Sequence, residues 1–167
     1  MEWTGIPSTD GGESLLIYRI LLFAFLFIGC SSTNNILPYP LTISEEGLGA
    51  IHADTPFDQV NTSLSGFTFE KLSQISPGQS EMIYQMKRGE SVLAHIVSDP
   101  SGKKIAAIHI LSPLIKNKYG QGVSDPLPRT NTLLCTAEEC RYRDEPSILY
   151  RIDSNQRTIR EITFSPL

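Results

Sequence analysis

From residue 41 onward, apolar and polar residues alternate with a period of two, which is typical of β-strands that bury one face. The segments with this pattern are short and rich in Ile, Val, Phe, Tyr and Thr. Turn sequences containing Gly, Pro, Asp or Asn separate several of them and favour tight reversals. Strands are predicted over residues 41–44, 49–53, 67–74, 81–87, 91–98, 104–111, 147–153 and 158–164.

One helix is predicted to begin at Thr55. Its hydroxyl is suited to cap the helix, and Pro56 fits the first helical turn. Phe57, Val60 and Leu64 recur at intervals of three and four residues, so that one apolar face can pack on the sheet. Gly66 is expected to end the helix.

A short apolar run precedes this domain. Residues 20–28 are apolar, and even when extended back to residue 15 the run is too short for a spanning helix and contains Arg19. Its length suits the core of a signal peptide. Gly29 and Cys30 follow, and the segment 26–30 resembles the lipobox of bacterial lipoproteins, in which the cysteine is acylated after cleavage. The alternative is a buried core helix, although no polar face interrupts the run.

The lipobox divides the chain into three parts. Residues 1–29 are predicted to be a lipoprotein signal peptide, 30–41 a lipidated N-terminus and flexible tether, and 42–167 a β-rich globular domain. Cys30 is the predicted lipid attachment site and would hold the protein to the membrane through its acyl chains. Ser31, rather than Asp, follows the cysteine, and lipoprotein sorting then favours the periplasmic face of the outer membrane. The expected fold class is α+β: a single periplasmic domain with a curved antiparallel β-sheet and one or two short helices.

Composition narrows the classes of partner. The 167 residues carry 14 basic and 18 acidic side chains, for a net charge of −4, and 40 % of them are hydrophobic. This is the composition of a globular domain rather than of a disordered chain. Without an excess of Lys and Arg, no nucleic-acid partner is expected.

The remaining cysteines, Cys135 and Cys140, enclose four residues. Export would place them in an oxidising compartment, where a structural disulfide that closes a hairpin is the favoured prediction. A redox pair is the first alternative, but no Cys-x-x-Cys at a helix start supports it. A metal site is the second, although no further ligands lie nearby in sequence. No metal and no cofactor are therefore predicted.

Histidines offer the main candidate for acid–base chemistry. His52, His95 and His109 each lie between aliphatic neighbours in a predicted strand, so that alternation places the isoleucines on one face and the histidines on the other. If their strands pair, two histidines become neighbours, which would allow weak metal binding or acid–base chemistry. His52 and Asp54 are the pair for a hydrolase, although no G-x-S-x-G motif accompanies them.

A mixed-charge cluster is expected near the C-terminal strands. Arg141, Arg143 and Arg151 lie near Asp144 and Glu145 in the sequence, and a solvated edge is the expected structure.

Residues 43–51 and 53–57 together resemble a family of enterobacterial envelope lipoproteins regulated by the sigma factor RpoE (sigma-E) and grouped as domain of unknown function 1131. The similarity extends through 105–111, Gly120 and Gly122 to the cysteine pair and residues 148–150. The stretch between Val123 and Cys135 is shorter than in the family. The resemblance implies an outer-membrane lipoprotein with a β-rich periplasmic domain, and it brings no catalytic residues.

Two functions remain open at this point. The first is a lipid-anchored envelope lipoprotein of Gram-negative bacteria that is not an enzyme, and that binds an envelope protein or supports envelope integrity, with a link to envelope stress. The alternative is a small periplasmic hydrolase that uses His52 and Asp54. The distance between histidine and carboxylate side chains distinguishes the two, because a general base must lie within hydrogen-bond reach of its partner.

Overall fold

The structure is a computed structural model that describes residues 41–72, 81–153 and 155–167. The chain divides into two compact units, Met1–Asn34 and Asn35–Leu167, and every described residue belongs to the second. The predicted signal peptide and tether therefore lie outside the described residues, apart from Leu41, which is buried in the core.

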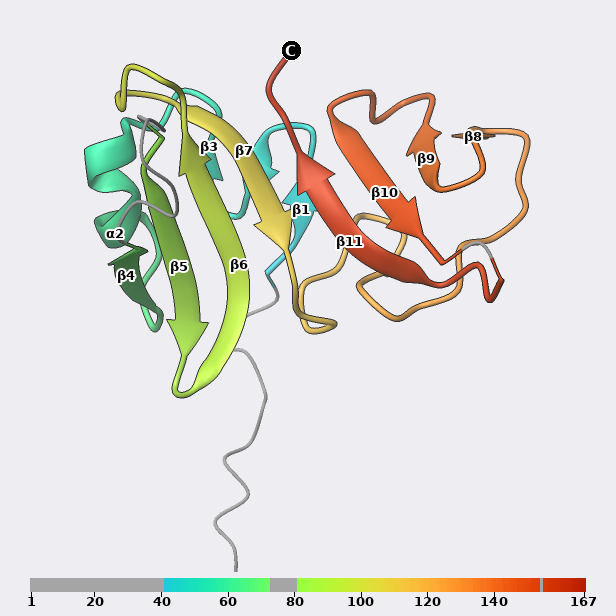
Figure 1. The fold of residues 1–167 in the computed structure, drawn as a ribbon, viewed down its shortest axis with the longest axis horizontal. Helices are drawn as coiled ribbons and strands as arrows, with labels where there is room; N and C mark the ends of the chain where they lie inside the picture. The colour runs from blue at the N-terminus through green and yellow to red at the C-terminus, as the bar shows by residue number, and fades with distance from the viewer. Residues whose placement is uncertain (1–40, 73–80, 154) are drawn as a thin grey trace, which may run out of the picture. The chain divides into compact units, whose positions relative to one another are not determined.

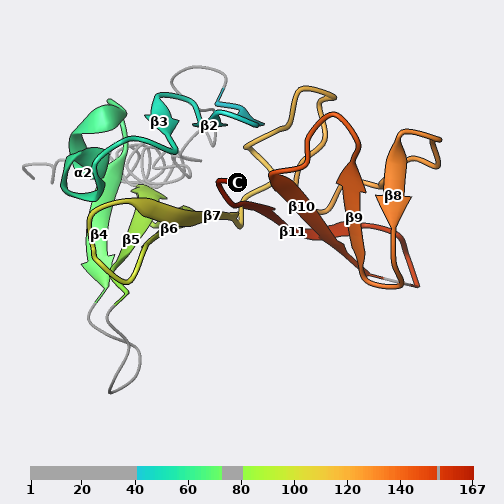
Figure 2. The same ribbon diagram turned by 90° about the horizontal axis from the view of Figure 1, so that it is seen from above.

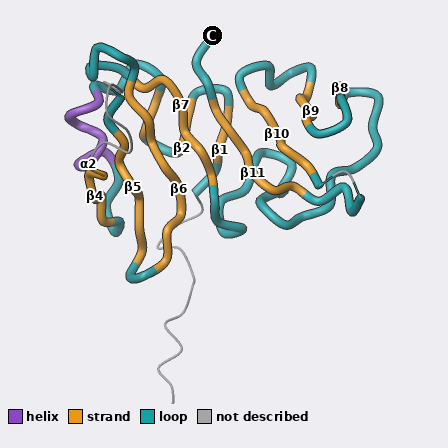
Figure 3. Tube along the Cα trace, in the orientation of Figure 1, coloured by secondary structure: helices purple, strands orange, loops and turns teal. Residues whose placement is uncertain are grey.

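Strands dominate the described part of the chain (Figures 1 and 3). The main sheet has eight strands in the order β4-β5-β6-β7-β11-β10-β9-β8, and each neighbouring pair is antiparallel. The sheet does not close, since β4 and β8 form its two edges. The strands are β4 (Thr68–Leu72), β5 (Ile83–Arg88), β6 (Ser91–Ser98), β7 (Ile105–Ile110), β8 (Leu133–Cys135), β9 (Glu139–Tyr142), β10 (Ile148–Ile152) and β11 (Ile159–Phe164).

Two meanders make up this sheet. Strands β4 to β7 follow one another along the chain and in space, and β8 to β11 do the same in the opposite spatial direction. The two meanders meet where β11 pairs with β7, with Phe164 opposite Ile108 and Ile162 opposite Ile110. The long connection 111–132 links them and is largely loop in Figure 3.

Six of the eight predicted strands correspond closely to strands of this sheet. The prediction missed β8 and β9, although it placed a disulfide-closed hairpin in this segment. Their residues are polar or exposed over much of the hairpin, so that the apolar alternation that marks the other strands is weak.

The strand predicted over 49–53 is confirmed only at residues 51–52, and its predicted bounds are wrong. The chain instead forms a small three-stranded sheet of β1 (Ile43–Ser44), β2 (Gly47–Leu48) and β3 (Ile51–His52). Leu48 pairs with Ile51, so that Gly49 and Ala50 form the tight turn between β2 and β3. Gly49 has φ +59°, the left-handed conformation that such a turn uses and that a straight strand excludes.

The predicted helix is present but shorter and begins later. A 3₁₀ turn, η1 (Phe57–Gln59), leads into α2 (Val60–Ser63), and Leu64 is already extended. Thr55 does not cap the helix. Its hydroxyl instead accepts a hydrogen bond from the backbone N–H of His52 at 2.9 Å, which stabilises the exit from β3.

The apolar face of this helix packs as the spacing predicted. Phe57, Val60 and Leu64 are all buried, and the Phe57 ring stacks on that of Tyr84 in β5 with 5.0 Å between ring centroids. In Figure 2, α2, β2 and β3 lie on one side of strands β4–β7. Their apolar side chains join those of the large sheet in one core cluster.

The fold is thus mostly antiparallel β-sheet with one short α-helix. The described residues contain no second α-helix after Val123, where turns and loops occupy the chain. Among the described residues, no helix combines the length and apolar character needed to cross a membrane.

Candidate functional site

A row of polar side chains crosses the middle of the large sheet. Gln85, His95, His109 and Thr163 are successive cross-strand neighbours on β5, β6, β7 and β11. The isoleucines beside the histidines, at 96, 108 and 110, are fully buried on the opposite face. The alternation predicted for these strands is confirmed, and so is the expectation that two histidines become neighbours when the strands pair.

Hydrogen bonds join the members at each end of this row. Gln85 Nε2 lies 3.0 Å from His95 Nε2. His109 Nδ1 lies 2.5 Å from Glu161 Oε1, and both side chains are only partly exposed. The Thr163 hydroxyl donates to the same Glu161 oxygen at 3.2 Å. The row is therefore anchored at its β11 end by a carboxylate.

The surroundings shift the protonation equilibria of this row. Burial lowers the pKa of His95, the neighbouring charge of His109 lowers it further, and the Glu161 carboxylate partly compensates. For Glu161, burial by itself raises the pKa, but the hydrogen bond and charge of His109, together with Thr163 and Arg151, outweigh burial and lower it. The result favours a neutral His95 beside an ionised Glu161.

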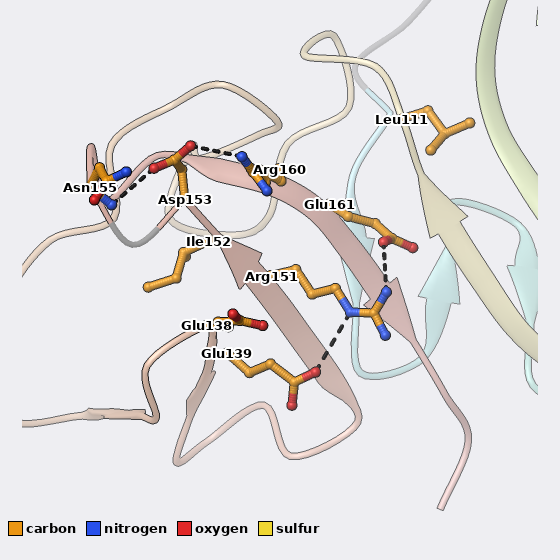
Figure 4. A pocket seen from close by; sticks show the side chains of 9 residues that line it. All are labelled: Leu111, Glu138, Glu139, Arg151, Ile152, Asp153, Asn155, Arg160 and Glu161. Atoms are coloured by element: carbon orange, nitrogen blue, oxygen red, sulfur yellow. Dashed lines mark hydrogen bonds and ion pairs between the residues drawn. The ribbon is translucent and has the colours of Figure 1, made fainter.

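A hollow of about 420 Å³ opens beside Glu161 (Figure 4). Its charged lining consists of four carboxylates and two guanidinium groups. The hollow is lined by Leu111, Glu138, Glu139, Arg151, Ile152, Asp153, Asn155, Arg160 and Glu161.

Arg151 lies between two of the carboxylates, as Figure 4 shows. Its Nη1 is 3.3 Å from Glu161 Oε2, and its Nε is 3.6 Å from Glu139 Oε1. At the other end of the hollow, Arg160 Nη2 lies 2.9 Å from Asp153 Oδ2. The strand register explains the first arrangement, since Arg151 is directly opposite both Glu161 on β11 and Glu139 on β9. The hollow thus presents several polar groups whose ion pairs face solvent.

The histidine–carboxylate–hydroxyl group does not have the geometry of a nucleophilic triad. In such a triad the acid and the hydroxyl bind different ring nitrogens, so that the imidazole can pass a proton between them. Here Glu161 and Thr163 both lie at Nδ1 of His109, at 2.5 and 3.2 Å. The arrangement holds the imidazole in place and offers no activated hydroxyl.

The structure does not join the side chains of His52 and Asp54, the pair that the sequence analysis considers for a hydrolase. Over the described ranges, no hydrogen bond or ion pair joins their side chains. Within the same part of the chain, no cluster of His, Cys, Asp or Glu has the arrangement of a metal site, and this includes His95 and His109.

Cys135 and Cys140 are cross-strand partners next to the turn of the β8–β9 hairpin and are joined by a disulfide. The structure therefore places the two cysteines as the hairpin prediction requires. Cys30, the predicted lipid attachment residue, lies outside the described residues.

Comparisons with known proteins indicate the fold alone. The chain is similar to the crystal structure of an uncharacterized protein of Escherichia coli, YfeY, with a TM-score of 0.58 and 18 % sequence identity. The match covers 74 % of this chain and 99 % of that one. A comparison with protein-family models gives no match, and neither does a comparison with curated proteins.

A second polar cluster, which the sequence did not reveal, surrounds Glu145 in the connection between β9 and β10. Glu145 is only 1 % exposed, so the expectation of a solvated edge is wrong at this residue. Its Oε2 accepts a hydrogen bond from the Tyr150 hydroxyl at 3.0 Å, and Asn117 donates to the same hydroxyl at 2.9 Å. Lys118 Nζ lies 3.6 Å from the other oxygen, Oε1, which has no hydrogen-bond partner. Burial raises the pKa of Glu145, because the charged form loses its hydration.

Part of the polar hollow beside Glu161 could have been predicted from the sequence. The predicted strands 147–153 and 158–164 and the turn between them imply a hairpin, and a hairpin register places Arg151 opposite Glu161. The burial of Glu145 had no comparable signal, since its neighbours Asp144 and Pro146 are exposed.

Proposed function

We propose that this protein is a lipid-anchored lipoprotein of the Gram-negative envelope, held at the periplasmic face of the outer membrane, and that it acts by binding an envelope protein rather than by catalysis. The hollow beside Glu161 is the observation that carries the binding role. The arginine of each of its ion pairs is exposed, and a polar partner can exchange these pairs for its own contacts at small cost, because ion pairs that water can reach contribute little stability.

The anchoring part of the proposal rests on the lipobox that ends at Cys30. The resemblance of residues 43–51 and 53–57 to RpoE-regulated lipoproteins supports a role in envelope integrity under stress. The hydrolase alternative has weaker support, because His52 and Asp54 share no contact in the described residues and the His109 group lacks a triad geometry.

Anchoring is tested with the variant Cys30→Ser, produced in a Gram-negative host. We expect loss of radiolabelled palmitate and release of the protein from the membrane fraction, because Cys30 is the cysteine that directly follows the signal core. Labelling that persists in the variant would refute the lipoprotein proposal.

Binding is tested by site-specific photo-crosslinking. A photoreactive residue at position 138, in the hollow, is compared with one at position 70, an exposed site on the edge strand β4. We expect a defined adduct with an envelope protein from position 138 and none from position 70. Identical adduct patterns at the two positions would show that the hollow is not the binding surface.

A further inference from the structure

A second hollow, of about 370 Å³, lies beside the edge strand β8 and shares no residue with the first. One wall is the strand itself, held to β9 by the Cys135–Cys140 disulfide. The loop before β8 and Arg157, from the turn before β11, complete it. The lining residues are Pro128, Arg129, Thr130, Asn131, Leu133, Cys135 and Arg157.

The charged side chains that line this second hollow are all positive. Its ionisable side chains are Arg129 and Arg157, since Cys135 is in the disulfide. Among the described residues, neither arginine forms an ion pair with a carboxylate. The arginines of the first hollow, in contrast, are both paired. Two guanidinium groups that line one depression without a counter-charge create a local attraction for anions.

Arg157 is also held in place while one of its donors stays unused. Its Nε is buried and has no hydrogen-bond partner among the described residues. Its backbone has φ +52°, a conformation that is uncommon for a residue other than glycine. Hydrogen bonds at both backbone groups keep it there: its N–H donates to the Asp153 carbonyl at 2.7 Å, and its carbonyl accepts from Leu127 N–H at 2.9 Å. Arg157 is therefore held at the hollow by its own backbone.

We propose that this hollow is a binding site for a phosphate monoester group. A phosphate monoester carries a charge between about −1.5 and −2 at neutral pH, which matches the two unpaired guanidinium groups. Guanidinium binds phosphate oxygens through paired N–H donors, and this geometry distinguishes arginine from lysine. Thr130 and Asn131 line the same hollow and add a hydroxyl and an amide as further donors.

The same phosphate chemistry is presented by a soluble metabolite and by a lipid headgroup. Two probes separate these sources: glycerol 3-phosphate, and dihexanoyl phosphatidic acid below its micelle concentration. Isothermal titration calorimetry is carried out on the full chain in non-ionic detergent at fixed ionic strength. We expect saturable binding that weakens between pH 7.5 and pH 5, because the second phosphate ionisation has a pKa of about 6.

Matched variants test the residues. Arg129→Gln and Arg157→Gln each remove one guanidinium. Each is expected to weaken phosphate binding about tenfold, because the free energy of a hydrogen bond to a charged group is large enough to change a binding constant by at least this factor. Arg143→Gln is the control: Arg143 is an exposed arginine outside the hollow and forms no ion pair in the described residues. It should bind like the wild type. Arg129 is exposed, so its variant keeps the test valid if Arg157→Gln fails to fold.

The outcomes are distinct. Binding of either probe that depends on Arg129 and Arg157 supports the site, with tighter binding of the phosphatidic acid identifying a lipid headgroup and equal binding identifying a soluble phosphate. Absence of binding by both probes at millimolar concentration overturns the proposal. An equal loss in Arg143→Gln also overturns it, because the attraction would then come from general surface charge.

Discussion

Phe57→Ala tests the packing of the 3₁₀ turn and α2 on the large sheet. Phe57 is 1 % exposed and stacks on Tyr84 with 5.0 Å between centroids. A buried aromatic side chain removes roughly 150–250 Å² from water, which at roughly 25 cal/mol per Å² and after allowance for the retained Cβ corresponds to about 3 kcal/mol. Loss of the aromatic pair adds roughly 0.5–1.5 kcal/mol. We therefore expect a destabilisation of about 3–5 kcal/mol, which is also the general range for Phe→Ala in cores.

Urea unfolding, followed by far-ultraviolet circular dichroism, measures this change. With a slope of roughly 2 kcal/mol per M, the midpoint should fall by about 2 M. Leu134→Ala is the control, because Leu134 on β8 is 54 % exposed and its truncation should cost less than about 1 kcal/mol. A loss below about 1 kcal/mol for Phe57→Ala would show that the helix face does not pack on the sheet as described.

Two further predictions concern the cysteine pair and the buried carboxyl group. Without reductant, Cys135 and Cys140 should resist alkylation in mass spectrometry of the purified protein, and replacing both with alanine should lower the free energy of unfolding by about 2 kcal/mol, given the short loop. Alkylation of both cysteines would contradict a structural bridge. Burial raises the pKa of Glu145 in the fold, so that its contribution to stability is present below the ordinary carboxyl pKa and is lost as the pH rises through the raised value. The free energy of unfolding of the wild type, relative to Glu145→Gln, should therefore fall as the pH rises above about 4 in urea titrations, and a difference that does not change with pH would refute this.

The sequence predicted those elements in which local pattern and tertiary environment agree. Strand β6 was predicted with the bounds that the structure has, because its alternation between Ile96 and His95 reflects one buried face and one polar face. The bounds of the strand predicted over 49–53 were wrong because the prediction followed the composition of these five residues and overlooked Gly49, which forms a turn. Thr55 likewise is a residue type that often caps helices, but its hydroxyl accepts a hydrogen bond from the backbone N–H of His52 instead.

The sites depend more on register than on local pattern. The contact of Arg151 with Glu161 follows from a hairpin whose ends can be read in the sequence. The second hollow joins residues near 130 to Arg157, which come together only through the order of strands β8 to β11. No local signal specifies that order, and none marks Glu145 as buried beneath Tyr150.

The junction of the two meanders also bears on the order in which the chain acquires its structure. Strands β4 to β7 pair one after another along the chain and can form early, whereas the free edge of β7 is covered only when β11, the last strand of the described residues, pairs with it. Until β11 arrives, β7 is an open edge that contains Ile108 and Ile110, and open apolar edges favour pairing with other chains. A growing chain therefore remains vulnerable to aggregation until residues 159–164 are available to pair with β7.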